Sequence, residues 1–254
     1  MLLGHIVIVM SPAPSRRATV VTDELRSRGF TVEAENWASI ARGGSTGVVG
    51  VDAPLAVVPL RNGNPLTVVS AIANAAHEGQ VPLLVTDPRL EAEIEPILSD
   101  PFLLRGERAG GREFFPVEDR IRLSDDSYAC VGATGAMEWF ENSGSTDDPP
   151  LVLRVGGETV ATLDSVGGLA CPGPSVSAFQ YSYARGDDGQ FRVFANGEAV
   201  GRYPGVSAMR ADGFRPVSLP LVPEHHVRDH GRLARATTVA TVGSDGTVSY
   251  RSFR

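Results

Sequence analysis

The feature that most constrains the fold is an alternation of apolar runs with helix-start signals. Uncharged, mostly apolar runs cover 55–60 and 81–85, which is typical of strands that are buried on both faces. Each run is followed by a cap residue and a proline, an Asn-Pro pair at 64–65 and an Asp-Pro pair at 87–88, and then by apolar residues at helical spacing. Strands that alternate with helices predict parallel strands joined by right-handed crossovers.

The start of the chain predicts a similar unit. Residues 6–10 form an apolar run, and residues 18–25 carry apolar side chains at helical spacing before Gly29. A second strand is expected over 30–34, which completes a strand-helix-strand unit of about thirty residues. We therefore expect residues 1–115 to form an α/β domain with an open, mostly parallel sheet that is flavodoxin-like or Rossmann-like.

Beyond this point the pattern changes to short strands and tight turns. Asn196-Gly197 is the strongest hairpin signal in the chain, and a last hairpin is expected over 237–253. We expect residues 116–254 to form a β-rich, antiparallel domain or extension.

The charge balance bears on the partners of the protein. The chain is acidic, with a net charge of −7, and all 23 of its basic residues are arginine. An acidic chain is repelled by nucleic acid as a whole, which disfavours a nucleic-acid partner. The absence of lysine excludes Schiff-base chemistry and the lysine of a P-loop.

Cysteine usage and hydropathy predict the compartment. Cys130 and Cys171 are too few for a disulfide framework and are expected to be free thiols of a reducing compartment. The apolar run at the start of the chain is too short for a signal peptide or a membrane span. We expect a soluble, cytoplasmic protein without a membrane partner.

Polar and basic residues gather where the predicted parallel strands end, which is the place where open α/β sheets bind ligands. With a strand order of 2-1-3-4, the loops after the first and third strands would meet. The residues expected at this anion-binding site are Ser11, Ser15, Arg16, Arg17, Arg61, Asn62, Asn64 and Asp87. Helix N-termini and arginines attract negative charge, so the predicted ligand is an anionic small molecule, for example a phosphorylated or nucleotide-like one. The serines, Asn64 and Asp87 also have an ordinary interpretation as helix caps.

The sequence identifies no cofactor. The loop after the first predicted strand lacks the G-x-G-x-x-G pattern of dinucleotide-binding domains, and it has prolines where a flavin phosphate loop needs glycine and threonine. No convincing nucleophile, acid or base is present, so whether the protein is an enzyme stays open.

A histidine cluster at 224–230 is the second candidate site. On a helix, His226 and His230 would share one face, with Asp229 close by, which predicts a metal site and a metal-dependent hydrolase as a weaker alternative. The cluster also has an ordinary interpretation as a solvated surface segment. A different alternative is a non-catalytic interaction or assembly protein, whose β-rich half presents an edge strand or the terminal hairpin to a second copy or another protein.

Overall fold

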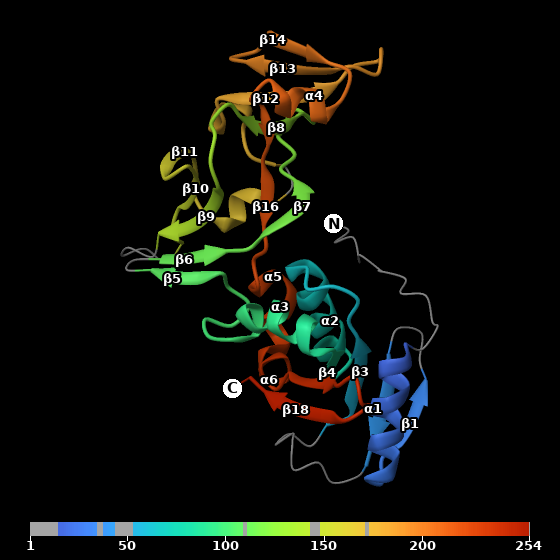
Figure 1. Cartoon of the computed structure of the whole chain (residues 1–254). Helices are drawn as coiled ribbons and strands as arrows, with labels where there is room; N and C mark the ends of the chain where they lie inside the picture. The colour runs from blue at the N-terminus through green and yellow to red at the C-terminus, as the bar shows by residue number, and fades with distance from the viewer. Residues whose placement is uncertain are drawn as a thin grey trace. The chain divides into compact units, whose positions relative to one another are not determined.

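The computed structural model (Figure 1) describes residues 15–34, 38–43, 53–108, 111–142, 148–170 and 173–253. The chain divides into two compact units: unit 1 comprises Met1–Leu103 and Pro223–Arg254, and unit 2 comprises Leu104–Val222. This division differs from the expected one at residue 115, because the C-terminal segment joins the sheet of the N-terminal segment. The strand expected over 6–10 lies outside the described residues.

Unit 1 is built on a six-stranded sheet with the order β1-β2-β3-β4-β17-β18. Its N-terminal segment contains α1 (Arg16–Ser27), β1 (Thr31–Ala34), β2 (Ser39–Arg42), β3 (Leu55–Pro59), α2 (Pro65–His77), β4 (Val81–Thr86) and α3 (Pro88–Leu98). Its C-terminal segment contains α5 (Glu224–Val227), η3 (Arg228–His230), α6 (Gly231–Arg235), β17 (Thr238–Val242) and β18 (Val248–Ser252).

The two helices with the Asn-Pro and Asp-Pro signals begin as the sequence predicts. The Asn64 side chain accepts a hydrogen bond of 2.9 Å from the Leu66 amide, and Asp87 accepts one of 2.8 Å from the Leu90 amide. Each cap satisfies an amide that has no partner within the helix, and the proline that follows has no amide hydrogen to satisfy.

The core of unit 1 lies on both faces of the central strands, and every residue of β4 and β17 is buried. On one face, Val21 and Leu25 of α1 pack with Val85 and Ala240. Because side chains alternate along a strand, Thr86 points to the opposite face, where α3 contacts both β4 and β17.

The expectation of an open, mostly parallel, flavodoxin-like or Rossmann-like sheet is wrong. Among the described strands of this sheet, only the pairs β3–β4 and β4–β17 are parallel. The pairs β1–β2, β2–β3 and β17–β18 are antiparallel. The connections between β1 and β2 and between β17 and β18 are too short for a crossover helix, so these strands form hairpins.

Unit 2 is β-rich, and its described strand pairs are all antiparallel. One five-stranded sheet has the order β11-β10-β9-β6-β5, a second has the order β14-β13-β12-β8-β15, and β16 pairs with β7. The strands of the first are β5 (Gly106–Arg108), β6 (Gly111–Phe114), β9 (Met137–Asn142), β10 (Leu151–Val155) and β11 (Glu158–Leu163). Those of the second are β8 (Tyr128–Val131), β12 (Tyr181–Arg185), β13 (Phe191–Ala195), β14 (Glu198–Tyr203) and β15 (Arg215–Pro216). The remaining elements are β7 (Pro116–Arg120), β16 (Ser218–Pro220), η1 (Val166–Leu169), η2 (Val176–Ala178) and α4 (Val206–Ala211).

Two apolar clusters stabilise unit 2. The larger one contains Phe114 and Trp139, and the Trp139 indole donates a hydrogen bond of 2.7 Å to the Ser218 carbonyl. The smaller one contains Cys130 of β8, Tyr183 of β12 and Met209 of α4. The hairpin predicted at Asn196-Gly197 is confirmed, because both residues have positive φ and join β13 to β14.

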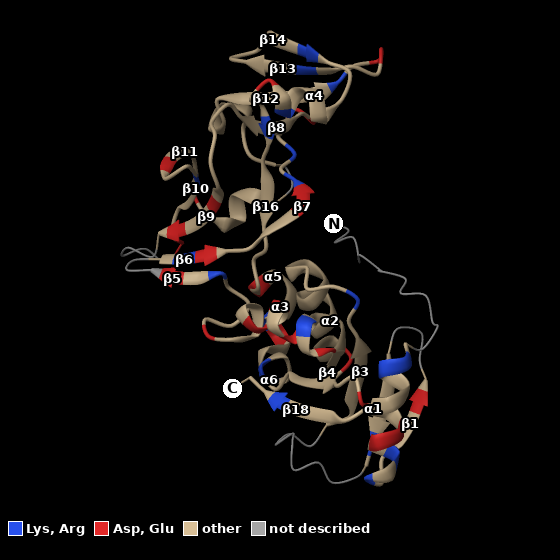
Figure 2. Ribbon diagram, viewed as in Figure 1, with Lys and Arg blue, Asp and Glu red and all other residues tan. Residues whose placement is uncertain are grey.

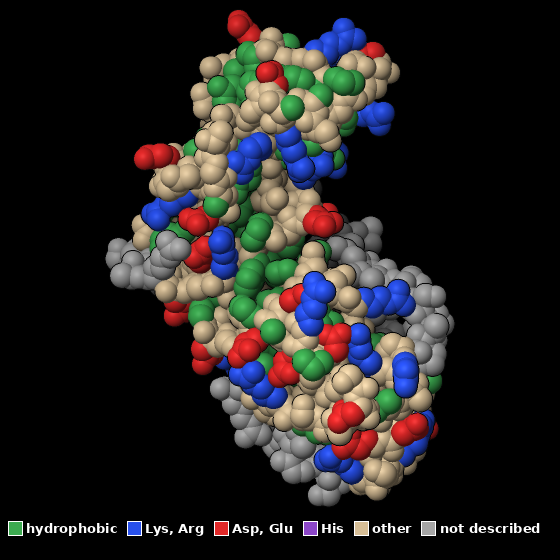
Figure 3. All heavy atoms as spheres, in the orientation of Figure 1, with side chains coloured by type: hydrophobic (Ala, Val, Ile, Leu, Met, Phe, Trp, Pro, Cys, Tyr) green, Lys and Arg blue, Asp and Glu red, His purple; other side chains and the backbone are tan. Residues whose placement is uncertain are grey.

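The surface carries charges of both signs. In Figure 3, basic and acidic side chains are interspersed over the face of unit 1 that is seen there. No helix in the part of the chain that the structure describes is long and apolar enough to cross a membrane.

Two backbone segments of unit 2, at Gly135 and Gly156, approach each other so closely that Gly135 has no room for a side chain. Gly135 has φ +107°, and a Cβ built on it would lie 2.7 Å from the Cα of Gly156. We expect Gly135→Ala to lower the free energy of unfolding by about 2–4 kcal/mol in denaturant titrations, because backbone strain adds to a clash with backbone atoms. Gly168→Ala is the control, since its Cβ would meet only Leu163 at 3.7 Å. An equal loss of unfolding free energy in the two variants would contradict the close approach of the backbone at Gly135.

Burial makes Cys130 unreactive. The residue is 0% exposed, and burial raises the pKa of its thiol from 9.0 to about 12. In a Cys171→Ser variant, a thiol reagent at about pH 8 should leave the native protein unlabelled and label it in urea, because only the thiolate reacts. As the pH rises, the thiol loses its proton at a lower pH in the unfolded chain than in the folded protein. The contribution of the buried thiol to stability is therefore full below pH 9.0 and is lost as the pH rises from there toward about 12. Rapid labelling of the native variant would refute this prediction.

Candidate functional site

The carboxyl ends of β3 and β4 lie side by side, because the two strands are parallel neighbours. The Leu60 amide donates a hydrogen bond of 3.0 Å to the Val85 carbonyl and holds the two exits together. The loop of Arg61, Asn62 and Asn64 therefore begins beside the Asp87 turn. These four predicted site residues share one edge of the sheet, which we call the carboxyl edge.

The first turn of α1 reaches the same edge. Arg17 Nη2 lies 2.5 Å from Asp87 Oδ2, so the start of the first helix is tied to the turn after β4. Figure 2 shows the basic residues on this first turn of α1. Ser15 caps the helix by accepting from the Ala18 amide at 3.2 Å, whereas Ser11 lies outside the described residues.

Several predicted ligand groups already have partners within the protein. Asn62 Oδ1 accepts from the Asn64 amide at 3.1 Å, and Asn64 and Asp87 cap α2 and α3. Asp87 is also the ion-pair partner of Arg17. These groups are therefore satisfied locally, and their contacts shape the carboxyl edge.

Arg16 and Arg61 are the two cations of this edge without an ion pair among the described residues. Both are exposed, Arg16 on the first turn of α1 and Arg61 directly after β3. Glu93 packs against Gly63 of the same loop, but its carboxylate accepts from Arg89 at 3.2 Å. Positive charge therefore exceeds negative charge where the two exits meet.

A buried polar network that sequence reasoning missed lies behind this edge. The Thr86 and Thr241 hydroxyls are 3.2 Å apart, and Thr241 donates to Glu91 Oε2 at 2.7 Å. Arg251 lies 3.9 Å from the same carboxylate. The signal in the sequence was the run over 238–242, whose alternating threonines and apolar residues are buried on both faces of β17.

The histidine segment does not form the predicted helical face. Glu224–Val227 is a short α-helix and Arg228–His230 a 3₁₀-helix, so His226 and His230 are not one α-helical turn apart. The His230 ring instead meets His77 of α2 edge-on, with ring centres 5.3 Å apart. No group of three or more histidine, cysteine, aspartate or glutamate side chains is arranged for a metal ion within the described residues. The metal site of His226, Asp229 and His230 thus gains no support.

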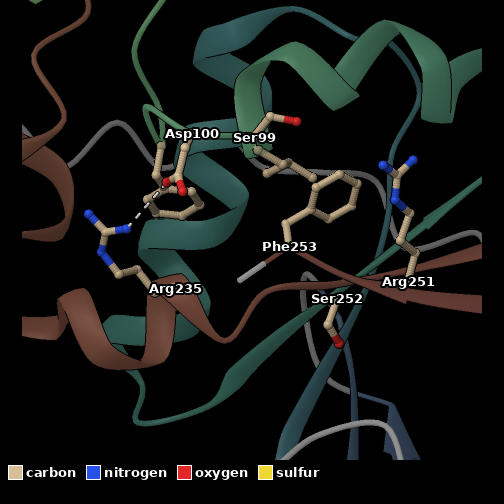
Figure 4. A pocket seen from close by; sticks show the side chains of 8 residues that line it. Ser99, Asp100, Arg235, Arg251, Ser252 and Phe253 are labelled. Atoms are coloured by element: carbon tan, nitrogen blue, oxygen red, sulfur yellow. Dashed lines mark ion pairs between the residues drawn. The ribbon is translucent and has the colours of Figure 1, made fainter. Parts of the chain in front are cut away.

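A cavity of about 480 Å³ lies at the other end of β17, between the end of α3, the end of α6 and the end of β18 (Figure 4). Nothing in the sequence pattern pointed to it, since its walls come from three separate stretches of the chain.

Comparison with known proteins gives no family: no family model, no curated protein and no solved structure matches the chain. Any function is therefore argued from the side chains themselves.

The Thr86–Thr241–Glu91 network can be tested by removing one hydroxyl. Thr241→Val keeps the shape but leaves the Thr86 hydroxyl, on a residue that is 0% exposed, without its partner. We expect a loss of about 1–3 kcal/mol in the free energy of unfolding, and a smaller loss for Thr241→Ser, which keeps the hydroxyl. If urea titrations gave Thr241→Val and Thr241→Ser the same free energy of unfolding, the network would contribute nothing to stability.

Proposed function

We propose that unit 1 binds an anionic small molecule at the carboxyl edge, with Arg16 and Arg61 as the groups that pair with it. The observation that carries this proposal is the Arg17–Asp87 ion pair at 2.5 Å, because it joins two segments that are distant in sequence at the exits of β3 and β4. The pair brings the first turn of α1, which begins at Arg16, to the edge where Arg61 follows β3.

Electrostatics favours an anion at this edge. The helices α2 and α3 both begin here, and the N-terminus of a helix carries a partial positive charge. Guanidinium groups add full charges and donate paired hydrogen bonds that match carboxylate and phosphate oxygens. Asp87 neutralises Arg17 but leaves Arg16 and Arg61 available.

A phosphorylated or nucleotide-like ligand is the finer form of the proposal. Its phosphate would accept from both arginines at once, whereas a small monovalent anion would need only one.

The experiment compares paired charge removals. In thermal-shift titrations with inorganic pyrophosphate, we expect the wild-type protein to be stabilised and Arg16→Gln/Arg61→Gln to lose most of that stabilisation. Arg26→Gln/Arg28→Gln is the matched control, since it removes two charges from the far end of α1, where Arg26 pairs with Asp23 and Arg28 pairs with Glu24. A double variant that responds to pyrophosphate as the control does would show that the site is elsewhere.

The interaction or assembly hypothesis stays a prediction. In unit 2, β14 is an edge strand, and its Val200 is 49% exposed. One exposed valine on an edge does not select a partner, so the carboxyl edge of unit 1 remains the better-supported site.

A further inference from the structure

The cavity at the end of β17 combines an apolar wall with an arginine, Arg235, whose side chain makes no hydrogen bond among the described residues. Leu98 is the last residue of α3, Arg235 is the last of α6, and Ser252, which pairs with Thr238, ends β18. The cavity therefore lies at the amino end of β17, away from the carboxyl edge. Its volume of about 480 Å³ is in the range of small-molecule sites.

Aromatic and aliphatic side chains form one side of this cavity. Leu98 and Phe253 are almost fully buried, and Phe102 is partly exposed. Figure 4 shows the Phe253 ring in the centre of the group, between the strand that carries Arg251 and the end of α3. A ligand ring placed here would bury apolar surface and contact aromatic edges or faces.

The two arginines of the cavity differ in how far their donors are used. Arg251 donates to Glu95 at 2.6 Å and is committed to that pair. Arg235 lies over the Phe102 ring at 5.3 Å, and its closest carboxylate, Asp100, is 3.9 Å away, which is beyond hydrogen-bond distance. Within the described residues Arg235 makes no hydrogen bond, and neither does the Ser99 hydroxyl.

We propose that this cavity binds an organic monocarboxylate that carries an aromatic ring. The carboxylate would accept paired hydrogen bonds from Arg235, the Ser99 hydroxyl would add a third, and the ring would lie against Phe102 and Phe253. This proposal does not rest on the carboxyl edge, because the two places share no residue.

Charge selects a monoanion over a phosphate ester. Asp100 lies beside Arg235, and the end of α3 at Ser99 contributes the partial negative charge of a helix C-terminus. Both repel a dianion more strongly than a singly charged carboxylate. The apolar wall in turn disfavours carboxylates without a ring, such as acetate.

Binding of phenylacetate to the full chain tests the proposal. In calorimetric or NMR titrations we expect phenylacetate to bind the wild type, and Arg235→Gln to weaken binding by roughly tenfold or more. Arg232→Gln is the matched control, because Arg232 is an exposed arginine on the same helix and does not line the cavity. Absence of phenylacetate binding, or equal binding by both variants, would overturn the proposal.

A variant that binds phenylacetate more tightly cannot owe its effect to misfolding, so it tests recognition directly. Asp100→Asn removes the repelling carboxylate and should tighten phenylacetate binding by roughly threefold. Acetate and phenyl phosphate should both bind more weakly than phenylacetate. If acetate bound with the same affinity as phenylacetate, the proposed role of the rings would be refuted. If phenyl phosphate bound more tightly than phenylacetate, the proposed preference for a monoanion would be refuted. Arg16→Gln/Arg61→Gln should leave phenylacetate binding unchanged, so failure of one site is distinguishable from failure of the other.

Discussion

The parallel pairing of β17 with β4 is the contact on which the rest of unit 1 depends. Residues 238–241 pair in register with residues 83–86, although the two segments are far apart in the sequence. This pairing buries both faces of β17, places Thr241 beside Thr86, and brings α6 and β18 to the end of α3. The polar network behind the carboxyl edge and the cavity at the opposite end both exist because of it.

The two ends of this sheet have opposite electrostatic characters. Helices α2 and α3 begin at the carboxyl edge, where two arginines lack ion-pair partners among the described residues. At the other end, α3 finishes beside Asp100, and Arg235 lies over the Phe102 ring, 3.9 Å from the Asp100 carboxylate. This contrast is the reason for proposing a multiply charged anion at the first end and a single carboxylate on an apolar body at the second.

Local signals in the sequence predicted what depends on neighbouring residues. The caps at Asn64 and Asp87, the buried strands that precede them and the Asn196-Gly197 turn were all readable, because cap and turn chemistry acts over a few residues. The shared location of Arg61 and Asp87 followed from parallel pairing of adjacent strands. The order and direction of the strands in the sheet were mispredicted, because the sequence of a buried strand near the C-terminus does not indicate which distant strand it pairs with. The Arg17–Asp87 pair and the cavity depend on that long-range arrangement and could not be predicted.

Native-state hydrogen exchange tests the discontinuous architecture of unit 1 most directly. The account predicts that the amides of Val239 and Ala240 in β17 open with the same free energy and the same denaturant dependence as those of Leu84 and Val85 in β4, because the two strands form one cooperative sheet. If the β17 amides exchange together with those of β12 in unit 2, or without protection while β4 stays protected, the C-terminal segment is not part of unit 1 and the account is wrong.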